Sequence, residues 1–351
     1  MYIRYAVEFE RRKFMEIMKK ILADAKSDMK KIVLPEGNEE RTLIASEIIK
    51  KEGYAYPILI GNKEEIINKS KEVGADISGI EIIDPAESDR LKIYIEAFYE
   101  LRKDKGMTLT KAEIIVRDPL YFGTMMVKLG DADGMVSGAV HTTGDLLRPG
   151  LQIIKTAPGV KTVSSFFIMS VPNCEYGNEG TLFFADCAVN PNPNEDQLAE
   201  IAIETAITAK RLGNIEPKVA MLSFSTMGSA DHENVLKVQN ACKKANELRP
   251  DLLIDGELQL DAALVNSVAK QKASDSKVAG KANVLIFPDL QSGNIGYKLV
   301  QRLAKATAVG PITQGFAKPI NDLSRGCSSE DIALVVAITA VQAQNIENNI
   351  R

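Results

Sequence analysis

Residues 31–60 read KIVLPEGNEERTLIASEIIKKEGYAYPILI, and this stretch decides the fold. Its two ends, KIVLP (31–35) and YPILI (56–60), are short apolar runs rich in Ile and Val, as in buried strands. The charged segment between them, about 39–52, has a helical pattern. A strand, a helix and a second strand form a βαβ unit, which predicts a parallel sheet covered by helices.

The same alternation extends in both directions along the chain. An amphipathic helix is expected over residues 9–30. The further strands that we expect are IEIID (80–84), GMVSG (134–138), KVAMLSF (218–224), LLIDGE (252–257), NVLIFP (283–288) and residues 307–313. The further helices are expected near 88–105, 117–130, 195–212, 232–248, 293–305 and 328–347. The chain is therefore predicted to have an α/β fold.

One segment, residues 161–188, departs from this alternation of strands and helices. VSSFFIMSV and TLFFADCAV are two apolar runs joined by the turn-rich NCEYGNEG. This pattern is typical of a hairpin, so the sheet is expected to become mixed here.

Composition excludes several classes of protein. The 351 residues amount to about two domains at roughly 150 residues each. With 45% hydrophobic and 26% charged residues and a net charge of −4, the chain resembles a folded globular protein and lacks the basic excess of a nucleic-acid binder. No run approaches the 18 or so apolar residues of a membrane span, and the charged opening residues do not resemble a secretory signal. We expect a cytoplasmic protein.

Cysteine and histidine are too sparse for several kinds of site. The four cysteines form no CxxC pair, and the two histidines, His141 and His232, lack zinc-finger spacing. No metal site or disulfide framework is predicted. If the chain is an enzyme, carboxylates and arginines are expected to carry the chemistry.

SGAVHTTGDLLRPGLQ (137–152) follows an expected strand and holds several hydroxyls. Its backbone N–H groups, Ser137 and Thr143 suit an anion at the start of a helix, and Arg148 adds a guanidinium that matches phosphate. An ordinary loop in which a threonine caps the helix explains the segment equally well. Neither a Walker loop nor a GxGxxG fingerprint is present.

NDLSRGCSSEDI (321–332) places Ser324, Arg325 and Asp331 near the start of the last helix. The structural alternative is a capping box between Ser328 and Asp331.

Two further segments fit either a structural or a functional role. The carboxylates of IDGELQLDAAL (254–264) could bind Mg²⁺ or serve as turn and surface residues. PDLQSGNIGYK (288–298) places Asn294 in a helix cap or in a second anion-binding loop.

Taken together, three long segments resemble the phosphate acetyltransferase (phosphotransacetylase) family. They are DPLYFGTMMVKLGDADGMVSGAVHTTGDLLRPGLQIIKTAPGVKTVSSFFIM, FPDLQSGNIGYKLVQRLA and GPITQGFAKPINDLSRGCSSEDI. The resemblance runs from KIVLPEGNEERT at residue 31 to the C-terminus and leaves the role of the first residues open.

The resemblance implies an acyltransferase that interconverts acetyl-CoA plus phosphate with CoA plus acetyl phosphate, by direct attack in a ternary complex. CoA or acetyl-CoA is then a substrate, with no permanently bound cofactor and no metal. The implied partners are these small molecules and a second copy of the chain in a homodimer, with neither nucleic acid nor membrane involved.

The resemblance also implies roles for individual residues. Asp331 is the base for the CoA thiol, and we expect partial burial to raise its pKa, since an ordinary Asp matches a thiol poorly. Arg325 neutralises the phosphate, and Ser324 donates to the reacting carbonyl. The expected additional contacts to the acyl phosphate are Ser137, Thr143 and Asn294. The arginines expected to bind CoA are Arg41, Arg102 and Arg148.

The family's fold implies two three-layer α/β domains, with a largely parallel sheet in each and the active site in the cleft between them. The first domain would comprise residues 1–159 plus 311–351 and the second 160–310. The dimer would form through the second domain, with a contribution from the hairpin at 161–188.

Four alternatives remain open from the sequence. A phosphate butyryltransferase would run the same chemistry on a longer acyl chain. A non-catalytic acetyl-CoA sensor would bind without turnover, and a metal- and NAD-dependent dehydrogenase of the isopropylmalate type would share a related architecture. An acyl-enzyme through Cys327 or Cys174 is the alternative mechanism.

Overall fold

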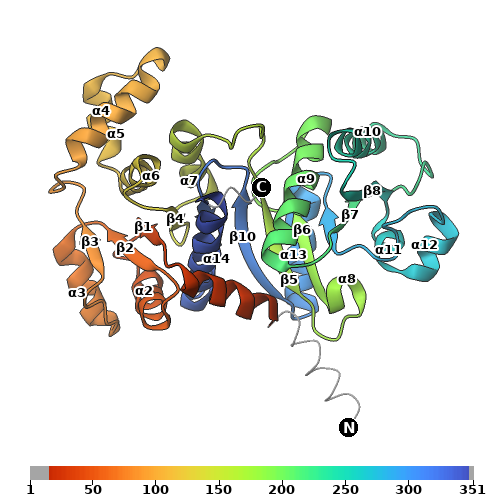
Figure 1. Ribbon diagram of the computed structural model, residues 1–351, viewed down its shortest axis with the longest axis horizontal. Helices are drawn as coiled ribbons and strands as arrows, with labels where there is room; N and C mark the ends of the chain where they lie inside the picture. The colour runs from red at the N-terminus through yellow and green to blue at the C-terminus, as the bar shows by residue number, and fades with distance from the viewer. Residues whose placement is uncertain (1–15, 348–351) are drawn as a thin grey trace, which may run out of the picture. The chain divides into compact units, whose positions relative to one another are not determined.

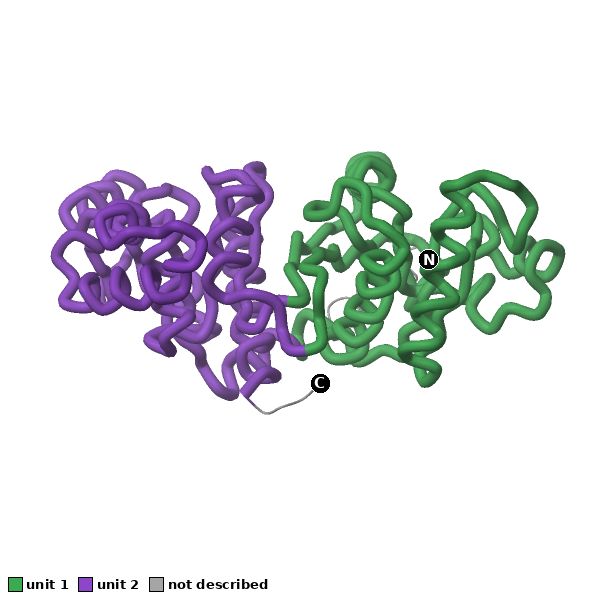
Figure 2. Tube along the Cα trace, turned by 90° about the horizontal axis from the view of Figure 1, so that it is seen from above, with its two compact units in different colours: residues 1–20, 159–315 green, residues 21–158, 316–351 purple. Residues whose placement is uncertain are grey.

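The computed structural model describes residues 16–347 and divides them into two compact units (Figure 2). Unit 2 comprises the chain from residue 21 to 158 and from 316 onward, and unit 1 comprises residues 159–315 together with residues 16–20 of the described part. Apart from residues 16–20, the chain therefore enters unit 1 at 158/159 and leaves it at 315/316, whereas the sequence placed these boundaries at 159/160 and 310/311.

Unit 2 is built on a five-stranded parallel sheet (Figure 1). Its strands, in spatial order, are β11 (Ile320–Asp322), β4 (Gly134–Ser137), β1 (Lys31–Leu34), β2 (Tyr56–Ile60) and β3 (Glu81–Ile83). The predicted βαβ unit is confirmed, since β1 and β2 pair in parallel and Lys31 lies opposite Tyr56. Strand β11 was not predicted, because Ile320 is the one apolar residue among its three and no apolar run marks it.

Helices cover both faces of this sheet. Gly123 of α6 (Pro119–Leu129) packs against Val33, whereas Gly134 of β4 lies beside Thr339 of α14 (Ser329–Glu347) and Ile32. Because consecutive residues of a strand point to opposite faces, α6 and α14 lie on opposite sides of β1. The remaining helices are residues 16–27, α2 (Glu40–Glu52), α3 (Lys63–Val73), α4 (Leu91–Arg102), α5 (Leu109–Val116) and α7 (Thr143–Pro149), with short turns at Lys103–Lys105 and Gly150–Ile154.

The first expected helix is described only in part. Residues 16–27 are helical, and residues 9–15 of the prediction lie outside the described residues. The helices α3 and α5 were not predicted from the sequence. Both begin at a polar cap, Asn62 for α3 and Thr108 for α5, whose side chains accept hydrogen bonds from backbone N–H groups of the first turn.

Unit 1 holds a six-stranded mixed sheet. Its strands, in spatial order, are β10 (Thr307–Gln314), β5 (Ser164–Ser170), β6 (Thr181–Ala185), β9 (Val284–Ile286), β7 (Lys218–Leu222) and β8 (Leu253–Leu258). The predicted hairpin is confirmed, since β5 and β6 pair antiparallel and β10 adds antiparallel to β5. The other strand pairs are parallel.

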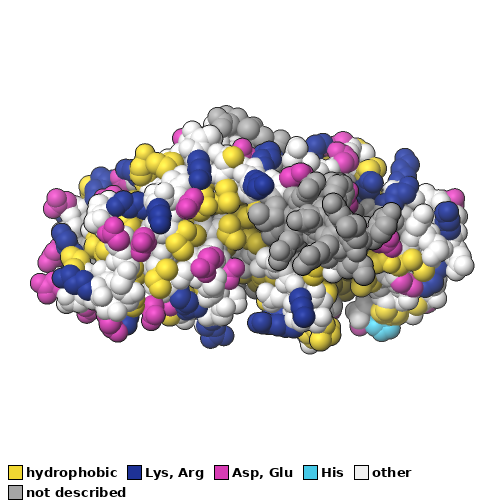
Figure 3. Space-filling view, turned by 90° about the horizontal axis from the view of Figure 1, so that it is seen from below, with side chains coloured by type: hydrophobic (Ala, Val, Ile, Leu, Met, Phe, Trp, Pro, Cys, Tyr) yellow, Lys and Arg dark blue, Asp and Glu magenta, His cyan; other side chains and the backbone are white. Residues whose placement is uncertain are grey.

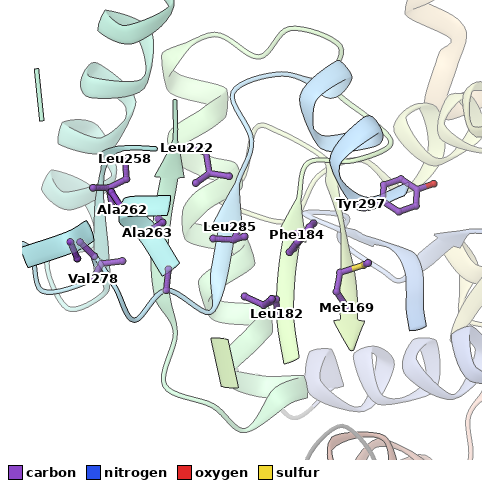
Figure 4. Packing of buried hydrophobic residues seen from close by; sticks show 14 of the residues in the cluster. Met169, Leu182, Phe184, Leu222, Leu258, Ala262, Ala263, Val278, Leu285 and Tyr297 are labelled. Carbon is purple, nitrogen blue, oxygen red and sulfur yellow. The ribbon is translucent and has the colours of Figure 1, made fainter. Parts of the chain in front are cut away.

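The helices of unit 1 surround a large apolar core. They are α8 (Tyr176–Glu179), α9 (Glu195–Gly213), α10 (Glu233–Leu248), α11 (Leu260–Leu264), α12 (Asn266–Lys272) and α13 (Leu290–Leu303). In the core, Leu182 and Phe184 of β6 lie near Leu285 of β9 (Figure 4). Phe167 stacks on Tyr297 of α13, with 4.1 Å between ring centroids.

Charges of both signs intermingle on the surface of each unit, as the face drawn in Figure 3 shows. This distribution agrees with the nearly balanced composition of 43 basic and 47 acidic side chains. Within residues 16–347, no helix is both long and apolar enough to span a membrane.

Candidate active site

The candidate site lies in unit 2, where β1, β4 and β11 end side by side at one edge of the sheet. Ligands of open α/β sheets bind outside the carboxyl ends of the strands. The segments that follow these three strands carry most of the residues singled out from the sequence. The site can therefore be described within one unit.

Glu36, just after β1, organises the loop that follows β4. Its carboxylate is 4% exposed and accepts hydrogen bonds from the backbone N–H groups of Gly138, Ala139, Val140 and His141, at 2.9 to 3.0 Å. The Nδ1 atom of His141 lies 2.8 Å from the same carboxylate. Burial alone would raise the pKa of Glu36, but these hydrogen bonds hold it below its ordinary value.

Glu36 was not predicted as part of the site, and the backbone N–H groups that donate to it were assigned to a ligand. The N–H groups of residues 138–141, expected to bind an anion, bind an internal carboxylate instead. The available signal was a lone acid directly after a buried strand, in KIVLPEG. The alternative of a threonine cap is confirmed, because Thr142 and Asp145 form a capping box at the start of α7.

Arg41, in the first turn of α2, joins two loops of the site. Its Nη1 atom donates to the carbonyl oxygens of Arg325 and Cys327, at 2.8 and 3.0 Å, and its Nη2 atom donates to that of Ala139 at 2.9 Å. Its Nε atom donates to Glu39 at 2.7 Å. The guanidinium that the resemblance assigned to CoA therefore cross-links the loops after β4 and β11.

Ser324 and Arg325 lie in an exposed turn directly after β11. The carbonyl of Ser324 accepts from the N–H of Cys327 at 2.9 Å, which closes the turn. Arg41 holds this turn through the carbonyl of Arg325. The turn thus has a fixed backbone and presents a hydroxyl and a guanidinium to solvent.

Asp331 caps the last helix and is partly exposed. Its Oδ2 atom accepts from the N–H of Ser328 at 2.9 Å, and its own N–H donates to Ser328 Oγ at 3.1 Å. The predicted capping box is therefore confirmed. The start of α14 favours a negative charge at this position, so the cap keeps a carboxylate at the end of the Ser324–Arg325 turn.

Asp322, the last residue of β11, is a second buried acid that the sequence analysis missed. It is 2% exposed and lies opposite Ser137, the last residue of β4, in parallel register. Thr143 Oγ1 donates to Asp322 Oδ2 at 2.5 Å. Burial raises the pKa of Asp322 to about 6, although the hydrogen bond from Thr143 opposes the shift. The signal was hidden because β11 was not recognised as a strand.

Arg102 and Arg148, two of the three arginines assigned to CoA, lie close to one tyrosine. Burial raises the pKa of Tyr121, and the positive charges of Arg148 and Arg102 oppose that shift. The Nε atom of Arg102 is buried without a hydrogen-bond partner among the described residues. The charges of Arg102 and Arg148 thus both reach Tyr121, whereas Arg41 is engaged at the loops.

Asn294 belongs to unit 1 and lies on α13. Its Nδ2 atom donates to the carbonyl of Cys187 at 3.1 Å. The cap of this helix is Asp289, whose side chain accepts from the N–H of Ser292 at 2.8 Å. The helix therefore begins earlier than the sequence predicted, with Asp289 at its cap and Asn294 inside it, and a contact of Asn294 with a ligand stays a prediction.

The acidic segment 254–264 is held by its own structural partners. Asp255 accepts from the hydroxyl of Ser276 and from a backbone N–H, and Asp261 pairs with Lys272 at 3.1 Å. Among residues 16–347, no group of three His, Cys, Asp or Glu side chains is arranged to hold a metal ion. The acids of this segment thus serve structural contacts.

Cys327 is buried beside the site. Burial raises the pKa of its thiol to about 11, although the charge of Arg41 opposes the shift. Because the thiolate is the nucleophilic form, this environment suppresses its reactivity.

The site therefore combines an exposed hydroxyl and guanidinium, a capping carboxylate and a buried acid at one edge of a parallel sheet. Such a set can neutralise phosphate, donate to a developing oxyanion and move a proton. This combination is typical of enzymes that transfer a group to or from phosphate.

Comparison with known proteins identifies the family. The family described as "Phosphate acetyl/butaryl transferase" matches residues 16–340. A phosphate acetyltransferase of Clostridium acetobutylicum is 66% identical over 94% of this chain and 99% of its own length, and one of Thermoanaerobacterium thermosaccharolyticum is 64% identical over 94% and 100%. The crystal structure of a phosphotransacetylase from Streptococcus pyogenes superposes with a TM-score of 0.89 at 49% identity, covering 94% of this chain and 99% of that one. The chain belongs to this family and is an acyltransferase.

Proposed function

We propose that this acyltransferase catalyses the reversible reaction of acetyl-CoA with phosphate to give CoA and acetyl phosphate, by direct attack in a ternary complex. The observation that carries the proposal is the anchored turn at Ser324 and Arg325, which is exposed and is followed in the first turn of α14 by the capping carboxylate of Asp331. Relatives with 66% and 64% identity, matched over nearly their whole length, are phosphate acetyltransferases and support the acetyl substrate.

Arg325 and Ser324 would act on the acyl phosphate. The guanidinium of Arg325 neutralises the phosphate with a planar pair of donors. The hydroxyl of Ser324 donates to the carbonyl oxygen, which becomes an oxyanion when the thiol attacks. Since Arg41 fixes the backbone of this turn before substrate arrives, little reorganisation is needed in the transition state.

Asp331 would accept the proton of the CoA thiol. A free thiol is mostly protonated at neutral pH, so a positioned base increases the fraction that reacts as thiolate. The sulfur then attacks the acetyl carbon directly. A route through an acyl-enzyme on Cys327 is disfavoured, because burial raises the pKa of that thiol to about 11.

CoA would bind through Arg102 and Arg148, whose proximity to Tyr121 provides two positive charges for its phosphates. Four of the five N–H groups of Arg41 already donate to the loops and to Glu39, which leaves one for CoA. We therefore propose that Arg41 mainly positions the loops.

The other residues assigned to the acyl phosphate differ in how deeply their side chains are buried. Thr143 is partly exposed and can contact the phosphate, whereas Ser137 is fully buried and would act from beneath the loop. For Asn294, a contact with substrate would require its amide to leave the carbonyl of Cys187. CoA, acetyl-CoA, phosphate and acetyl phosphate remain the proposed ligands.

We further propose a homodimer that works in the cytoplasm. The predicted contact through the hairpin is limited, because β5 and β6 both lie inside the sheet. A better candidate in the same unit is the outer face of α13, where Ile295, Leu299 and Leu303 are 57%, 52% and 80% exposed. Large apolar residues four positions apart form one helix face that favours association. The free cysteines agree with a reducing compartment.

The deciding experiment measures CoA-dependent thioester formation from acetyl phosphate, with propionyl and butyryl phosphate as competitors. Wild type should turn over rapidly and prefer acetyl phosphate, and Arg325→Gln and Asp331→Asn should each lose at least about 100-fold. Binding of CoA without turnover would favour the acetyl-CoA sensor instead. A preference for butyryl phosphate would favour the longer acyl chain.

A further inference from the structure

Two polar side chains at the end of the unit 2 sheet are buried and incompletely paired. Among residues 16–347, Asp322 Oδ1 and Ser137 Oγ have no hydrogen-bond partner. The two residues are 2% and 0% exposed and end neighbouring strands in register. An unpaired buried polar atom costs about 1 to 3 kcal/mol, so such atoms call for a functional explanation.

The surroundings of Asp322 favour its protonated form. Beyond burial, the negative charge of Glu36 raises the pKa of Asp322, because it disfavours a second negative charge nearby. Glu36 itself contacts His141. Glu36 is held ionised by the N–H groups of the loop after β4. The hydrogen bond from Thr143 and the nearby N–H of Leu323 favour the ionised form of Asp322 but do not outweigh burial. Asp322 therefore takes up a proton at a higher pH than Glu36 does.

Thr143 is the route from this buried acid to a ligand. Asp322 is buried, whereas Thr143 is partly exposed at the start of α7. At 2.5 Å, either Thr143 Oγ1 or Asp322 Oδ2 can hold the shared proton. When Asp322 is protonated on Oδ2, it donates to Thr143, and the hydroxyl proton of Thr143 is free to point outward.

The backbone of the loop closes over Asp322. Gly138 has φ of +122°, and a Cβ atom placed on it would lie 2.5 Å from Asp322 Oδ1 and 2.6 Å from the N–H nitrogen of Leu323. Only a glycine permits this approach. The backbone at Gly138 thus covers Asp322, and among the described residues the hydroxyl of the partly exposed Thr143 is hydrogen-bonded to its side chain.

We propose that Asp322 and Thr143 form a proton relay that protonates the departing phosphate in this reaction, and that Asp322 is the proton store of the relay. The inference rests on the proposed function, because it assigns a role in that same site. Thr143 contacts the phosphate, and Asp322 is a positioning residue that acts through Thr143.

The proton balance of the reaction requires such a donor. If the phosphate departs from the acetyl carbon without gaining a proton, it leaves as the trianion, which is a poor leaving group. In the proposed step, the thiol proton passes to Asp331, the sulfur–carbon bond forms and the carbon–oxygen bond to phosphate breaks. The phosphate oxygen takes the proton of Thr143, and Thr143 takes that of Asp322.

The relay also works in reverse. Hydrogen phosphate gives its proton to Thr143 as it attacks acetyl-CoA, Thr143 gives its own to Asp322, and Asp331 returns a proton to the CoA sulfur. Exchange with solvent resets both acids, so each direction transfers one proton between sulfur and phosphate overall.

The experiment compares Asp322→Asn, Thr143→Val and Thr143→Ser with wild type in kcat, KM and their pH dependence. Asp322→Asn and Thr143→Val should each lower kcat about 100-fold or more with little change in either KM. Wild-type kcat should fall on the alkaline side, where the store is ionised, and this limb should be absent in both variants. Thr143→Ser keeps the hydroxyl and should stay within severalfold of wild type with the limb intact.

The double variant Asp322→Asn/Thr143→Val separates a relay from two unrelated defects. Groups that act as one unit are strongly non-additive, so the double variant should lose no more than the worse single variant. Circular dichroism and thermal unfolding show whether each variant is folded.

Two outcomes would overturn the relay. If Asp322→Asn keeps kcat within severalfold and retains the alkaline limb, the store lies elsewhere. If its losses appear only in KM or in thermal stability, Asp322 has a structural role. An inactive wild type would instead overturn the proposed function itself, and the two failures are therefore distinguishable.

Discussion

Arg41 and Arg325 lie 284 positions apart in the chain, and the guanidinium of Arg41 donates to the backbone carbonyl of Arg325 at 2.8 Å. One arginine thereby sets the position of another. The same guanidinium holds the carbonyl of Ala139, so the loops after β4 and β11 share one support. The site depends on this cross-link as well as on the side chains that face substrate.

Arg41→Lys should loosen both loops, because a lysine is a single point of donation and cannot replace a planar fork with several donors. We expect kcat to fall at least about tenfold and the free energy of unfolding to drop by about 1 to 3 kcal/mol. Urea unfolding and hydrogen exchange at residues 325–327 measure the effect. Arg117→Lys, at the exposed C-terminal cap of α5, is the matched control. A rise in KM for CoA with unchanged loop exchange would instead support the original assignment of Arg41 to CoA.

Glu36→Gln should destabilise unit 2 by about 3 kcal/mol or more. The amide nitrogen would face backbone N–H groups that now donate to a carboxylate oxygen, and unpaired buried donors cost about 1 to 3 kcal/mol each. Chemical denaturation measures the loss, and exposed Glu40→Gln should stay within about 0.5 kcal/mol of wild type.

The pH dependence provides a second test of Glu36. Its pKa in the folded state is lowered from the ordinary 4.5, so its contribution to stability is present above that pH and is lost as the pH falls below it. Glu36→Gln should therefore lose part of the acid sensitivity of wild type. Equal acid sensitivity in both proteins would mean that the carboxylate is not held as described.

Arg102→Gln and Arg148→Gln should each raise KM for CoA about tenfold with little change in kcat. The charges of both arginines act on Tyr121, and we assign both side chains to the phosphates of CoA and not to the reacting groups, so their contribution should be equal in the ground and transition states. Arg117→Gln serves as the surface control. A loss in kcat at constant KM would place these arginines at the chemistry instead.

The parallel sheet of unit 2 was predictable because β1 and β2 are continuous apolar runs with a long helix between them. Strand β11 was not, since Ile320 is the one apolar residue among its three, and Asp322 was missed with it. The use of loop N–H groups by Glu36 depends on contacts 102 to 105 positions apart, which local sequence does not encode. Ser324, Arg325 and Asp331 stood out in their own segment, but their roles came only from the resemblance of several motifs to one family.

Leu299→Lys together with Leu303→Glu should weaken the proposed dimer. Both leucines lie on the exposed face of α13, where a buried charge would be costly. Analytical ultracentrifugation over a range of concentrations should show a shift from dimer to monomer, while Leu109→Lys on unit 2 leaves association unchanged. A wild type that is monomeric at all concentrations, or a variant that associates like wild type, would contradict the assignment.

Asp322→Asn should make the protein more stable at pH 8 and have little effect at pH 4. The pKa of Asp322 is raised from 3.8 to about 6 in the folded state, so its protonated form favours folding. The stabilising effect of that proton is complete below 3.8 and is lost as the pH rises through about 6. Asparagine is never ionised and avoids this loss, which amounts to about 3 kcal/mol at most for a shift of this size.

Urea unfolding of both proteins between pH 4 and pH 8 tests this prediction. Wild type should become less stable relative to Asp322→Asn as the pH rises through about 6. A parallel pH dependence in the two proteins would show that Asp322 is not the acid that takes up the proton. A variant that is more stable yet loses kcat would mean that the chain retains a destabilising buried acid for the reaction, as enzymes do where activity requires a strained or charged site.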